Sequence, residues 1–473
     1  MHKMQPLSLS QKLIIPTLLA WSLGGCTLAP DYIRPEAPVP EHYAATRQAT
    51  GQPADAVLPA WKSFFTDETM QQVIQIAMDN NRDLRMAILN IEKTRAQYRI
   101  QRADLLPTIN ASTGGISQRL PAEFNSMGTE GVSRQYTASL GFSAFELDLF
   151  GRIRSLTEQA LETFHAAEAD AKAARLSLVA ETAGMYLQLV ADREIYDLTA
   201  ATLKNREENL ALVEKKFTAG VASDLDVSQA QSLVNEAQTD LAVLATRVGQ
   251  DENYLELLMG SPLPKDLPQV RKLSEVAALQ DIPEGLPSLL LENRPDIQAA
   301  EHLLKGANAS IGAARANFFP TISLTAGLGR MSSDYSNLFD AGGRHWLFSP
   351  QLVMPIFDTG RNIARLEVSE AERDLAIARY EKAIQVAFRE VADTLVQREN
   401  MQTQLLSQES LVQSVGRSYQ HASSRYEAGV ASYINVLDAQ RSLYVAQSSL
   451  ISTRLLREAN ALTLYKALGG GWS

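Results

Sequence analysis

Two stretches of the chain alternate apolar with polar residues, and we expect them to form β-strands with one apolar and one polar face. In the first, the alternating residues are Tyr136, Ala138, Leu140, Phe142 and Ala144 on one side and Thr137, Ser139, Gly141 and Ser143 on the other. In the second, they are Ile322, Leu324, Ala326 and Leu328 against Ser323, Thr325, Gly327 and Gly329. Partner strands are predicted near residues 108–118 and 346–357, with loops rich in Gly and Ser at 125–133 and 332–343. The chain is therefore predicted to contain two hairpins.

These four strands have two interpretations. Either the hairpins pack their apolar faces on a soluble core, or they insert into a membrane. Lipid does not tolerate unpaired strand edges, and single-chain membrane barrels start at about eight strands, so an oligomer would have to supply the rest. In the membrane interpretation, the residues that face lipid are Leu140, Phe142, Leu324 and Leu328, and those that face a water-filled lumen are Ser139, Ser143, Ser323 and Thr325.

Two long segments without proline predict very long helices. Residues 151–217 and 361–426 are rich in Ala, Leu, Glu, Arg and Gln, and an interior proline would cost about 3 kcal/mol. Within the first segment, the 4-3-4-3 spacing of a coiled-coil seam is followed by Leu176, Ala180, Ala183, Leu187 and Val190. At about 1.5 Å per residue, each helix would reach about 100 Å.

The two halves of the chain repeat one another. The string Ala-Gly-Val-Ala-Ser occurs at 219–223 and again at 428–432, an offset of 209 residues that also aligns Gly151 with Gly360. We predict a first repeat over residues 61–270 and a second over 271–473, each with a helix, a hairpin, a long helix, a tip turn and a return helix. Gly220 and Gly429 are expected to take the left-handed conformation that ends a helix.

The amino terminus predicts a lipid-anchored envelope protein. A basic start and an apolar segment lead to Leu23-Gly24-Gly25-Cys26, which resembles the signal of bacterial lipoproteins. Residues 1–25 would then be a signal peptide and Cys26, the only cysteine, the site of lipid attachment. Thr27 rather than Asp follows it, which in that class favours the outer membrane. Residues 26–60 are rich in proline and are predicted to be an extended linker from the anchor.

Composition and motifs exclude several other classes. The net charge is −10 without a basic cluster, so nucleic acid is not expected as a partner. No segment after residue 26 has the ~18 consecutive apolar residues of a membrane-spanning helix. The six histidines lie scattered without metal-ligand spacing, and no nucleophile or phosphate-binding motif occurs in a suitable context. We therefore expect no enzyme, no metal and no cofactor.

An ordered series of motifs carries a resemblance that covers almost the whole chain after Cys26. The motifs are Asp31–Pro35, Phe145–Arg152, Asn293–Ile297, Val436–Arg441 and Tyr465–Trp472. With these motifs the chain resembles the TolC-type outer-membrane efflux channels, in the OprM-like (NodT-type) lipoprotein branch.

The resemblance implies a fold that is mainly α with a membrane β part. A long α-helical barrel would extend through the periplasm, and four strands per chain would complete a 12-stranded β-barrel in a homotrimer. The implied function is a passive exit duct in the outer membrane for drugs and other small molecules. The implied partners are a periplasmic adaptor (membrane fusion) protein and an inner-membrane pump of the resistance–nodulation–division (RND) class.

The resemblance also implies a gate at the periplasmic tip. Adaptor contact would involve the tip turns Gly220, Val221, Ala222, Ser223, Gly429, Val430, Ala431 and Ser432. A latch would join Tyr426 to Asp226, Asp438 would form a carboxylate ring across the pore, and Ile434 would be an apolar constriction. Asn435 stands where TolC has a second acidic residue, so a single acidic ring is implied. The alternative for Asp438 is a solvated residue paired with Arg441, worth a few tenths of a kcal/mol.

Two other functions remain open at this point. The same fold exports proteins in type I secretion, and a coiled-coil lipoprotein without membrane strands would also contain the two long helices. Conductance in a planar bilayer would separate a channel from such a tether.

Overall fold

The computed structural model describes residues 27–40, 43, 59–124, 128–264, 272–276, 293–340 and 342–471. The predicted signal peptide and its Cys26 lie outside the described residues. Residues 27–40 contain neither helix nor strand. Among the described helices, none combines the length and the apolar character needed to cross a membrane.

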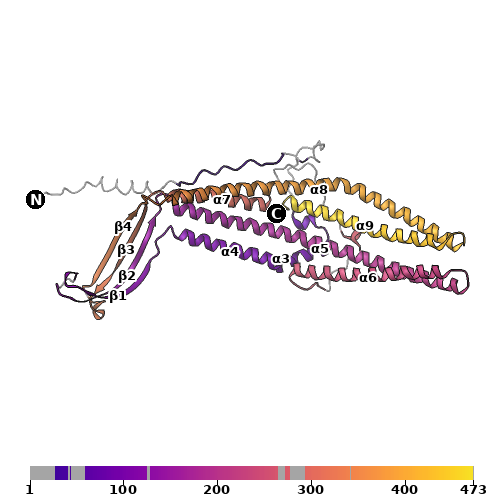
Figure 1. Ribbon diagram of the computed structural model, residues 1–473, viewed down its shortest axis with the longest axis horizontal. Helices are drawn as coiled ribbons and strands as arrows, with labels where there is room; N and C mark the ends of the chain where they lie inside the picture. Colours follow the sequence, from indigo (N-terminus) through magenta and orange to yellow (C-terminus); the bar gives the residue numbers. More distant parts are fainter. Residues whose placement is uncertain are drawn as a thin grey trace. The chain divides into compact units, whose positions relative to one another are not determined.

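Helices dominate the chain, and four strands interrupt them at two places (Figure 1). The helices are α2 (Trp61–Phe64), α3 (Glu68–Asn80), α4 (Arg82–Ala103), α5 (Arg152–Thr218), α6 (Asp224–Met259), α7 (Pro295–Ala316), α8 (Arg361–Glu427) and α9 (Tyr433–Ala467). The strands are β1 (Asn110–Leu120), β2 (Gly131–Leu147), β3 (Thr321–Ser332) and β4 (Arg344–Val353). Short 3-10 turns lie at Ala122–Phe124, Leu273–Glu275 and Tyr335–Asn337. The mainly helical fold with four strands is thus confirmed.

The chain divides into two compact units, each built from both predicted repeats. One unit holds the described parts of residues 1–36, 90–167 and 299–380, which include all four strands. The other holds the described parts of residues 37–89, 168–298 and 381–473, which include α3, α6, α9 and the ends of α5 and α8. The duplication therefore pairs equivalent elements of the two halves within each unit.

The two predicted long helices form with equal lengths. α5 and α8 each contain 67 residues, and both their first and last residues differ by the offset of 209 seen in the sequence. The predicted seam of α5 is confirmed, because Ala183 and Leu187 are fully buried and Leu176, Ala180 and Val190 are at most 8% exposed. Alanine at these places lets a neighbouring helix approach closely.

The strands form one antiparallel sheet in the order β1-β2-β3-β4. The two hairpins were predicted; their joining through β2 and β3 was not. In the register, Leu140 lies opposite Leu328, which lies opposite Trp346. Because directly opposite residues share a face, the sheet has one apolar face, which contains Ala111, Leu140, Phe142, Ile322, Leu324, Ala326, Leu328, Trp346, Phe348, Pro350 and Leu352. We call this surface the apolar face, and the opposite one the polar face.

The polar face carries most of the predicted polar residues. Its members include Ser112, Ser139, Glu146, Ser323, Thr325, Ser349 and Gln351. Ser112 and Ser139 are hydrogen-bonded to each other through their hydroxyls, 2.9 Å apart. The alternation is looser in β4, where Leu347 and Val353 lie on the polar face.

One predicted strand position is wrong. The alternation placed Ala144 among the apolar residues, but a β-bulge between Phe142 and Phe145 shifts the register, and Phe145 pairs with Leu324 instead. Ala144 has a positive φ of 52°, and its N–H donates to the hydroxyl of Thr325 at 3.0 Å. A bulge inserts an extra residue, so the residues after it change faces relative to a strict alternation with a period of two.

The strand bounds also differ from the prediction. β1 begins two residues later than expected, at Asn110, and extends to Leu120. β4 begins at Arg344 and ends at Val353, short of the expected residue 357. Pro355 has no N–H to donate to a ladder, which explains why the strand stops before it.

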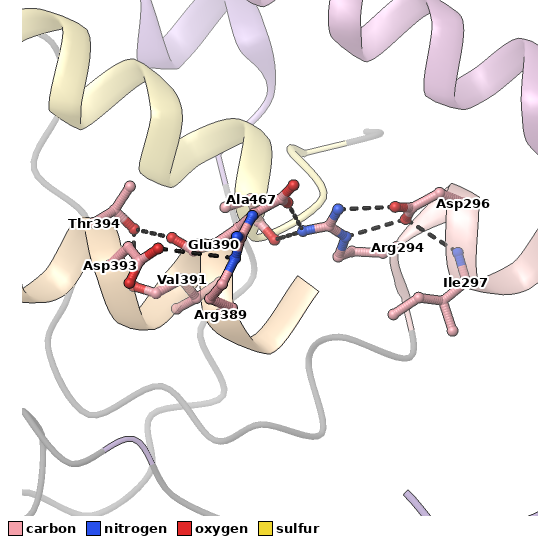
Figure 2. A network of polar contacts seen from close by, with 9 residues as sticks. All are labelled: Arg294, Asp296, Ile297, Arg389, Glu390, Val391, Asp393, Thr394 and Ala467. Atoms are coloured by element: carbon pink, nitrogen blue, oxygen red, sulfur yellow. Dashed lines mark hydrogen bonds and ion pairs between the residues drawn. The ribbon is translucent and has the colours of Figure 1, made fainter. Parts of the chain in front are cut away.

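The segment before α7 is held by a buried arginine. Figure 2 shows Arg294 between Asp296, at the start of α7, and Glu390 of α8. Its guanidinium donates to both Asp296 carboxylate oxygens at 3.1 and 2.8 Å, to Glu390 at 2.9 Å and to the carbonyl of Ala467 at 2.8 Å. Arg294 is 7% exposed, so water hardly reaches its guanidinium, and these protein groups compensate its charge instead. Although burial raises the pKa of Asp296, hydrogen bonds from Arg294 and its charge hold that pKa below its usual value.

The motif Asp31–Pro35 near the amino terminus has a similar role in the other unit. The guanidinium of Arg34 forms an ion pair with Glu301 of α7, and the hydroxyl of Tyr32 donates to the same carboxylate at 3.3 Å. The amide of Asn308 donates to the carbonyl of Pro30 at 2.6 Å. Residues 30–34 therefore lie along α7.

Candidate functional site

The two tip turns reverse the chain with the same backbone geometry. Gly220 (φ 75°) and Gly429 (φ 72°) are both left-handed. Val221 N–H donates to the carbonyl of Lys216 at 2.8 Å, and Val430 N–H donates to the carbonyl of Arg425 at 3.0 Å. Gly220 N–H also donates to the carbonyl of Phe217 at 2.9 Å, and Gly429 N–H to that of Tyr426 at 3.0 Å, so each turn is a Schellman motif. The predicted left-handed conformation of both glycines is confirmed.

The caps of the two return helices differ. In the first turn, Ser223 and Asp226 form a capping box, in which the hydroxyl accepts from Asp226 N–H and the carboxylate accepts from Ser223 N–H at 2.9 Å. In the second turn, Ser432 caps α9 without a hydrogen bond from its side chain. The carboxylate of Asp226 is therefore engaged in holding its own turn.

A small apolar cluster joins the two helical hairpins below the turns. Its buried members are Val213, Ala230, Leu233, Tyr433, Val436 and Leu437. They come from α5, α6 and α9, so the first and second repeats share this core. Tyr426 and Ala222 pack against its edge. The helices of the two tips are therefore in direct packing contact.

Tyr426 contacts residues other than the one predicted for it. The ammonium of Lys216 lies 4.0 Å from the centroid of the Tyr426 ring, and the ring of Tyr433 lies 5.0 Å away. Among the described residues, no hydrogen bond joins Tyr426 to Asp226 within the chain. The latch between Tyr426 and Asp226 therefore stays a prediction.

Tyr433 is the aromatic residue most deeply placed at the tip. It is 5% exposed, and its pKa is raised to about 12 by burial and then by the neighbouring Tyr426, Tyr419 and Asp226. Its phenol therefore stays neutral over the physiological range and acts as a packing group.

The remaining gate residues lie together on the exposed face of α9. Ile434 is 41% exposed, and Asn435, Asp438 and Arg441 are exposed one helical turn apart, on the side away from buried Val436. Among the described residues, no ion pair joins Asp438 to Arg441, so the carboxylate of Asp438 is not neutralised by that neighbour. The exposed row is free to face water or a second chain.

The turns themselves expose apolar side chains. Val221 is 77% exposed and Val430 is 66% exposed, and Leu225, in the first turn of α6, is 64% exposed. Ala222 and Ala431 are half-buried beneath them, and Ser223 and Ser432 are exposed. The turns present a small apolar surface at the end of each hairpin.

Sequence reasoning missed two residues of this site. Lys216 and Tyr433 flank the predicted turns. The sequence does not indicate that the Lys216 ammonium and the Tyr433 ring both contact the ring of Tyr426. The offset of 209 aligns Lys216 with Arg425, which marked a cation before each turn without showing its partner. In the part of the chain that the structure describes, no group of three or more His, Cys, Asp or Glu side chains could hold a metal ion.

Comparison with known proteins identifies the family. The model of the "Outer membrane efflux protein" family matches the chain twice, at residues 73–261 and 286–470. The chain is 47% identical over 470 residues to the "Probable efflux pump outer membrane protein TtgC" of Pseudomonas putida, which covers 98% of this chain and 96% of that protein. The two matches agree with the internal duplication.

Solved structures show the same fold. A membrane protein from Pseudomonas aeruginosa superimposes with a TM-score of 0.87 at 42% identity, covering 94% of this chain and 98% of that one. The open state of the Neisseria gonorrhoeae MtrE outer membrane channel gives a TM-score of 0.84 at 37% identity, covering 94% and 98%. These similarities extend over the sheet, the long helices and the tips. The chain, which is not an enzyme, belongs to the outer membrane efflux protein family.

Proposed function

We propose that this chain is the outer-membrane exit channel of a tripartite efflux pump and releases drugs, solvents and other small molecules. The related TtgC protein is named as a probable efflux pump outer membrane protein, and MtrE is named as an outer membrane channel. The channel is a passive duct, so the energy for export comes from the pump that it serves.

The observation that carries this proposal is the exposed apolar face of the sheet. Leu140, Leu328, Trp346, Phe348 and Leu352 are between 58% and 72% exposed in the single chain. An apolar surface of this kind marks contact with lipid or protein. The opposite face is lined by Ser and Thr, as suits a water-filled passage.

The proposal requires an oligomer. Strands β1 and β4 are the two edges of the sheet, and lipid does not tolerate their unpaired backbone groups. A homotrimer resolves this, because β4 of each chain then pairs with β1 of the next. Many apolar residues of the long helices are exposed in one chain, including Leu375 (55%), Val396 (54%) and Leu406 (57%) on α8, and a neighbouring chain would cover them.

The tip turns are proposed as the gate and as the contact for a periplasmic adaptor. Exposed Val221 and Val430 supply an apolar contact for the adaptor. The exposed row of Ile434, Asn435 and Asp438 on α9 is proposed to line the narrow end of the duct. An inner-membrane pump of the RND class would deliver the solutes.

A lipid on Cys26 is proposed to anchor the chain in the outer membrane. The support is the sequence Leu23-Gly24-Gly25-Cys26 and the docking of the following segment, residues 30–34, along α7. Mass spectrometry of the protein extracted from membranes should find an acylated amino-terminal peptide that begins at Cys26. An unmodified peptide that begins at Met1 would rule out the anchor.

The channel is tested by conductance. The purified full-length protein, added to a planar lipid bilayer, should give discrete current steps, and native mass spectrometry should give the mass of three chains. A preparation that binds the bilayer but never conducts would contradict the channel function and favour the alternative of a structural lipoprotein.

The substrate class is tested in cells. In a host whose own exit channel is deleted and whose pump and adaptor are present, this chain should restore resistance to solvents and antibiotics. Restored protein secretion with no change in drug resistance would instead favour type I secretion.

A further inference from the structure

The charged residues of the sheet are distributed very unevenly. In the four described strands the charged side chains, other than histidine, are Arg119, Arg134, Glu146, Arg330 and Arg344. The register places all four arginines on the apolar face, toward the strand ends that lead into the hairpin loops. Glu146 lies on the polar face at the other end of the sheet, where it forms an ion pair with Arg152 at 2.6 Å.

Two of these arginines are direct neighbours. Arg330 of β3 and Arg344 of β4 are register partners, one row beyond the pair Leu328 and Trp346. Like charges placed directly opposite each other on a sheet repel. This arrangement is therefore unfavourable in the chain alone, and a bound anion would relieve the repulsion.

No acidic side chain neutralises the pair. Among the described residues, neither Arg330 nor Arg344 forms an ion pair, and the same holds for Arg134. Arg330 donates to the backbone carbonyls of Phe339 (2.7 Å) and Asp340, which orient the guanidinium without cancelling its charge. Arg119 is different, because it is paired with Glu130 at 3.0 Å.

The surroundings are those of a membrane boundary. Trp346, next to the arginines on the side of the apolar rows, is 71% exposed, and Tyr136, beyond them, packs edge-on against Tyr335 with ring centroids 5.7 Å apart. Aromatic residues with a polar tip favour the interface between lipid and water. From Ile322 to Leu328 the apolar rows span about 20 Å at ~3.4 Å per residue, close to the ~25 Å of a membrane apolar band. The arginine pair therefore lies at the level of lipid headgroups.

We propose that Arg330 and Arg344 form a binding site for the phosphate of an anionic lipid headgroup. This inference rests on the proposed function, which puts the apolar face into the outer membrane. A phosphate monoester carries close to two negative charges at neutral pH, which match the two guanidinium groups. Each guanidinium can donate two parallel hydrogen bonds to phosphate oxygens, which a lysine cannot do. The ligand is thus a phosphorylated lipid of the outer leaflet, held at the rim of the sheet.

The test measures lipid retained by the full-length protein. Purified protein is reconstituted in phosphatidylcholine nanodiscs that contain a minor fraction of lipid A with its phosphates, and bound lipid A is counted by native mass spectrometry. The double variant R330Q/R344Q should bind lipid A at least about tenfold more weakly, as expected for loss of charged hydrogen bonds. The control His345→Gln removes a polar side chain next to Arg344 but on the polar face, and it should bind as the unchanged protein does.

Further measurements distinguish lipid-bound phosphate from free phosphate, and failure of this site from failure of the proposed channel function. Lipid A stripped of its phosphates should not be retained, and inorganic phosphate should not compete at equal concentration; competition would mean a free-phosphate site and would overturn the lipid assignment. Equal retention of lipid A by R330Q/R344Q and the unchanged protein would overturn the site itself. The same preparations are tested in planar bilayers. If the unchanged protein conducts normally but does not retain lipid A, only this site is refuted, whereas absence of conductance refutes the proposed function.

Discussion

The ammonium of Lys216 lies 4.0 Å from the centroid of the Tyr426 ring, and this contact joins the first tip turn to the second within one chain. Lys216 lies in the last turn of α5 and Tyr426 in the last turn of α8, so the two long helices are linked close to where the chain reverses. A cation above an aromatic ring is worth about 0.5–1 kcal/mol at an exposed site and about 2 kcal/mol where water is excluded. The contact is strong enough to bias a gate and weak enough to be broken when one opens.

Lys216→Met should loosen the tip. Methionine keeps the length of the side chain and removes the charge, so the proposed channel should be open about two to thirty times more often, which corresponds to ~0.5–2 kcal/mol. Single-channel recording measures the open probability. Lys215→Met is the matched control, because this neighbouring lysine is exposed and should have no effect. Equal open probabilities for the two variants would show that Lys216 does not stabilise the closed gate.

The hydroxyl and the ring of Tyr426 are expected to have separable roles. If a latch from Tyr426 to Asp226 forms in the closed channel, Tyr426→Phe combined with Asp226→Ala should raise conductance, since a hydrogen bond to a carboxylate contributes ~1.5–3 kcal/mol. If only the ring matters, Tyr426→Phe should leave conductance unchanged and Tyr426→Leu should raise it. Asp226→Ala also destroys the capping box, so Ser223→Ala, which breaks the same cap, is the control. Equal effects of Ser223→Ala and Asp226→Ala would speak against the latch.

Arg294→Met should destabilise the protein strongly. It leaves Asp296 and Glu390 without their shared cation and the carbonyl of Ala467 without its donor. Breaking a fully buried pair costs ~3–5 kcal/mol, and because the two carboxylates are 47% and 38% exposed, the loss should lie at or below the lower end of that range. Arg389→Gln, next to Glu390 in α8, is the control, because Arg389 and Asp393 are 70% and 73% exposed and 3.9 Å apart, a pair worth ~0–1 kcal/mol. Thermal unfolding of both variants checks this.

The same network predicts a dependence on pH. Because the folded state lowers the pKa of Asp296, its contribution is present above the ordinary carboxyl pKa and is lost as the pH falls through the lowered value. The unchanged protein should therefore lose part of its thermal stability on acidification, and Arg294→Met should lose less. The same acid sensitivity in both proteins would contradict the assignment.

Much of this architecture could be predicted from the sequence, because long helices and alternating strands follow local periodicity. The two long segments without proline predicted the bounds of α5 and α8 to within one or two residues, and the repeated glycines predicted both turns.

Residue pairs that come into contact only after folding could not be predicted. Lys216 and Tyr426 are far apart in sequence, and the bulge at Ser143 and Ala144 depends on the hydroxyl of Thr325 in another strand. The proposed gate residues of α9 were predicted only through the resemblance to TolC-type channels, because the spacing of Asp438 and Arg441 alone fits an ion pair on a solvated helix face equally well.

The two faces of the sheet should tolerate charge very differently. Leu140→Arg places a cation among Leu328 and Trp346 on the apolar face, and such a change costs ~2–4 kcal/mol at the middle of a membrane. Ser139→Arg changes the adjacent residue on the polar face and should cost far less. Insertion of each variant into outer membranes, measured by the yield of trimer that resists denaturation, should fall only for Leu140→Arg. Equal yields would mean that the apolar face does not contact lipid.

Asp438 should determine the ion selectivity of the proposed duct. Its carboxylate is exposed on α9 one helical turn after Asn435, and among the described residues no cation pairs with it. Where several chains bring such carboxylates around one axis, their charges add and attract cations into a narrow neck. Asp438→Asn keeps the size of the side chain and removes the charge, so the reversal potential in a salt gradient should shift toward zero while trimer stability stays unchanged. Asn435→Asp should shift it the other way, because it adds a second acidic ring one turn away. If the reversal potential is the same in the unchanged protein and in both variants, α9 does not line the narrow part of the channel.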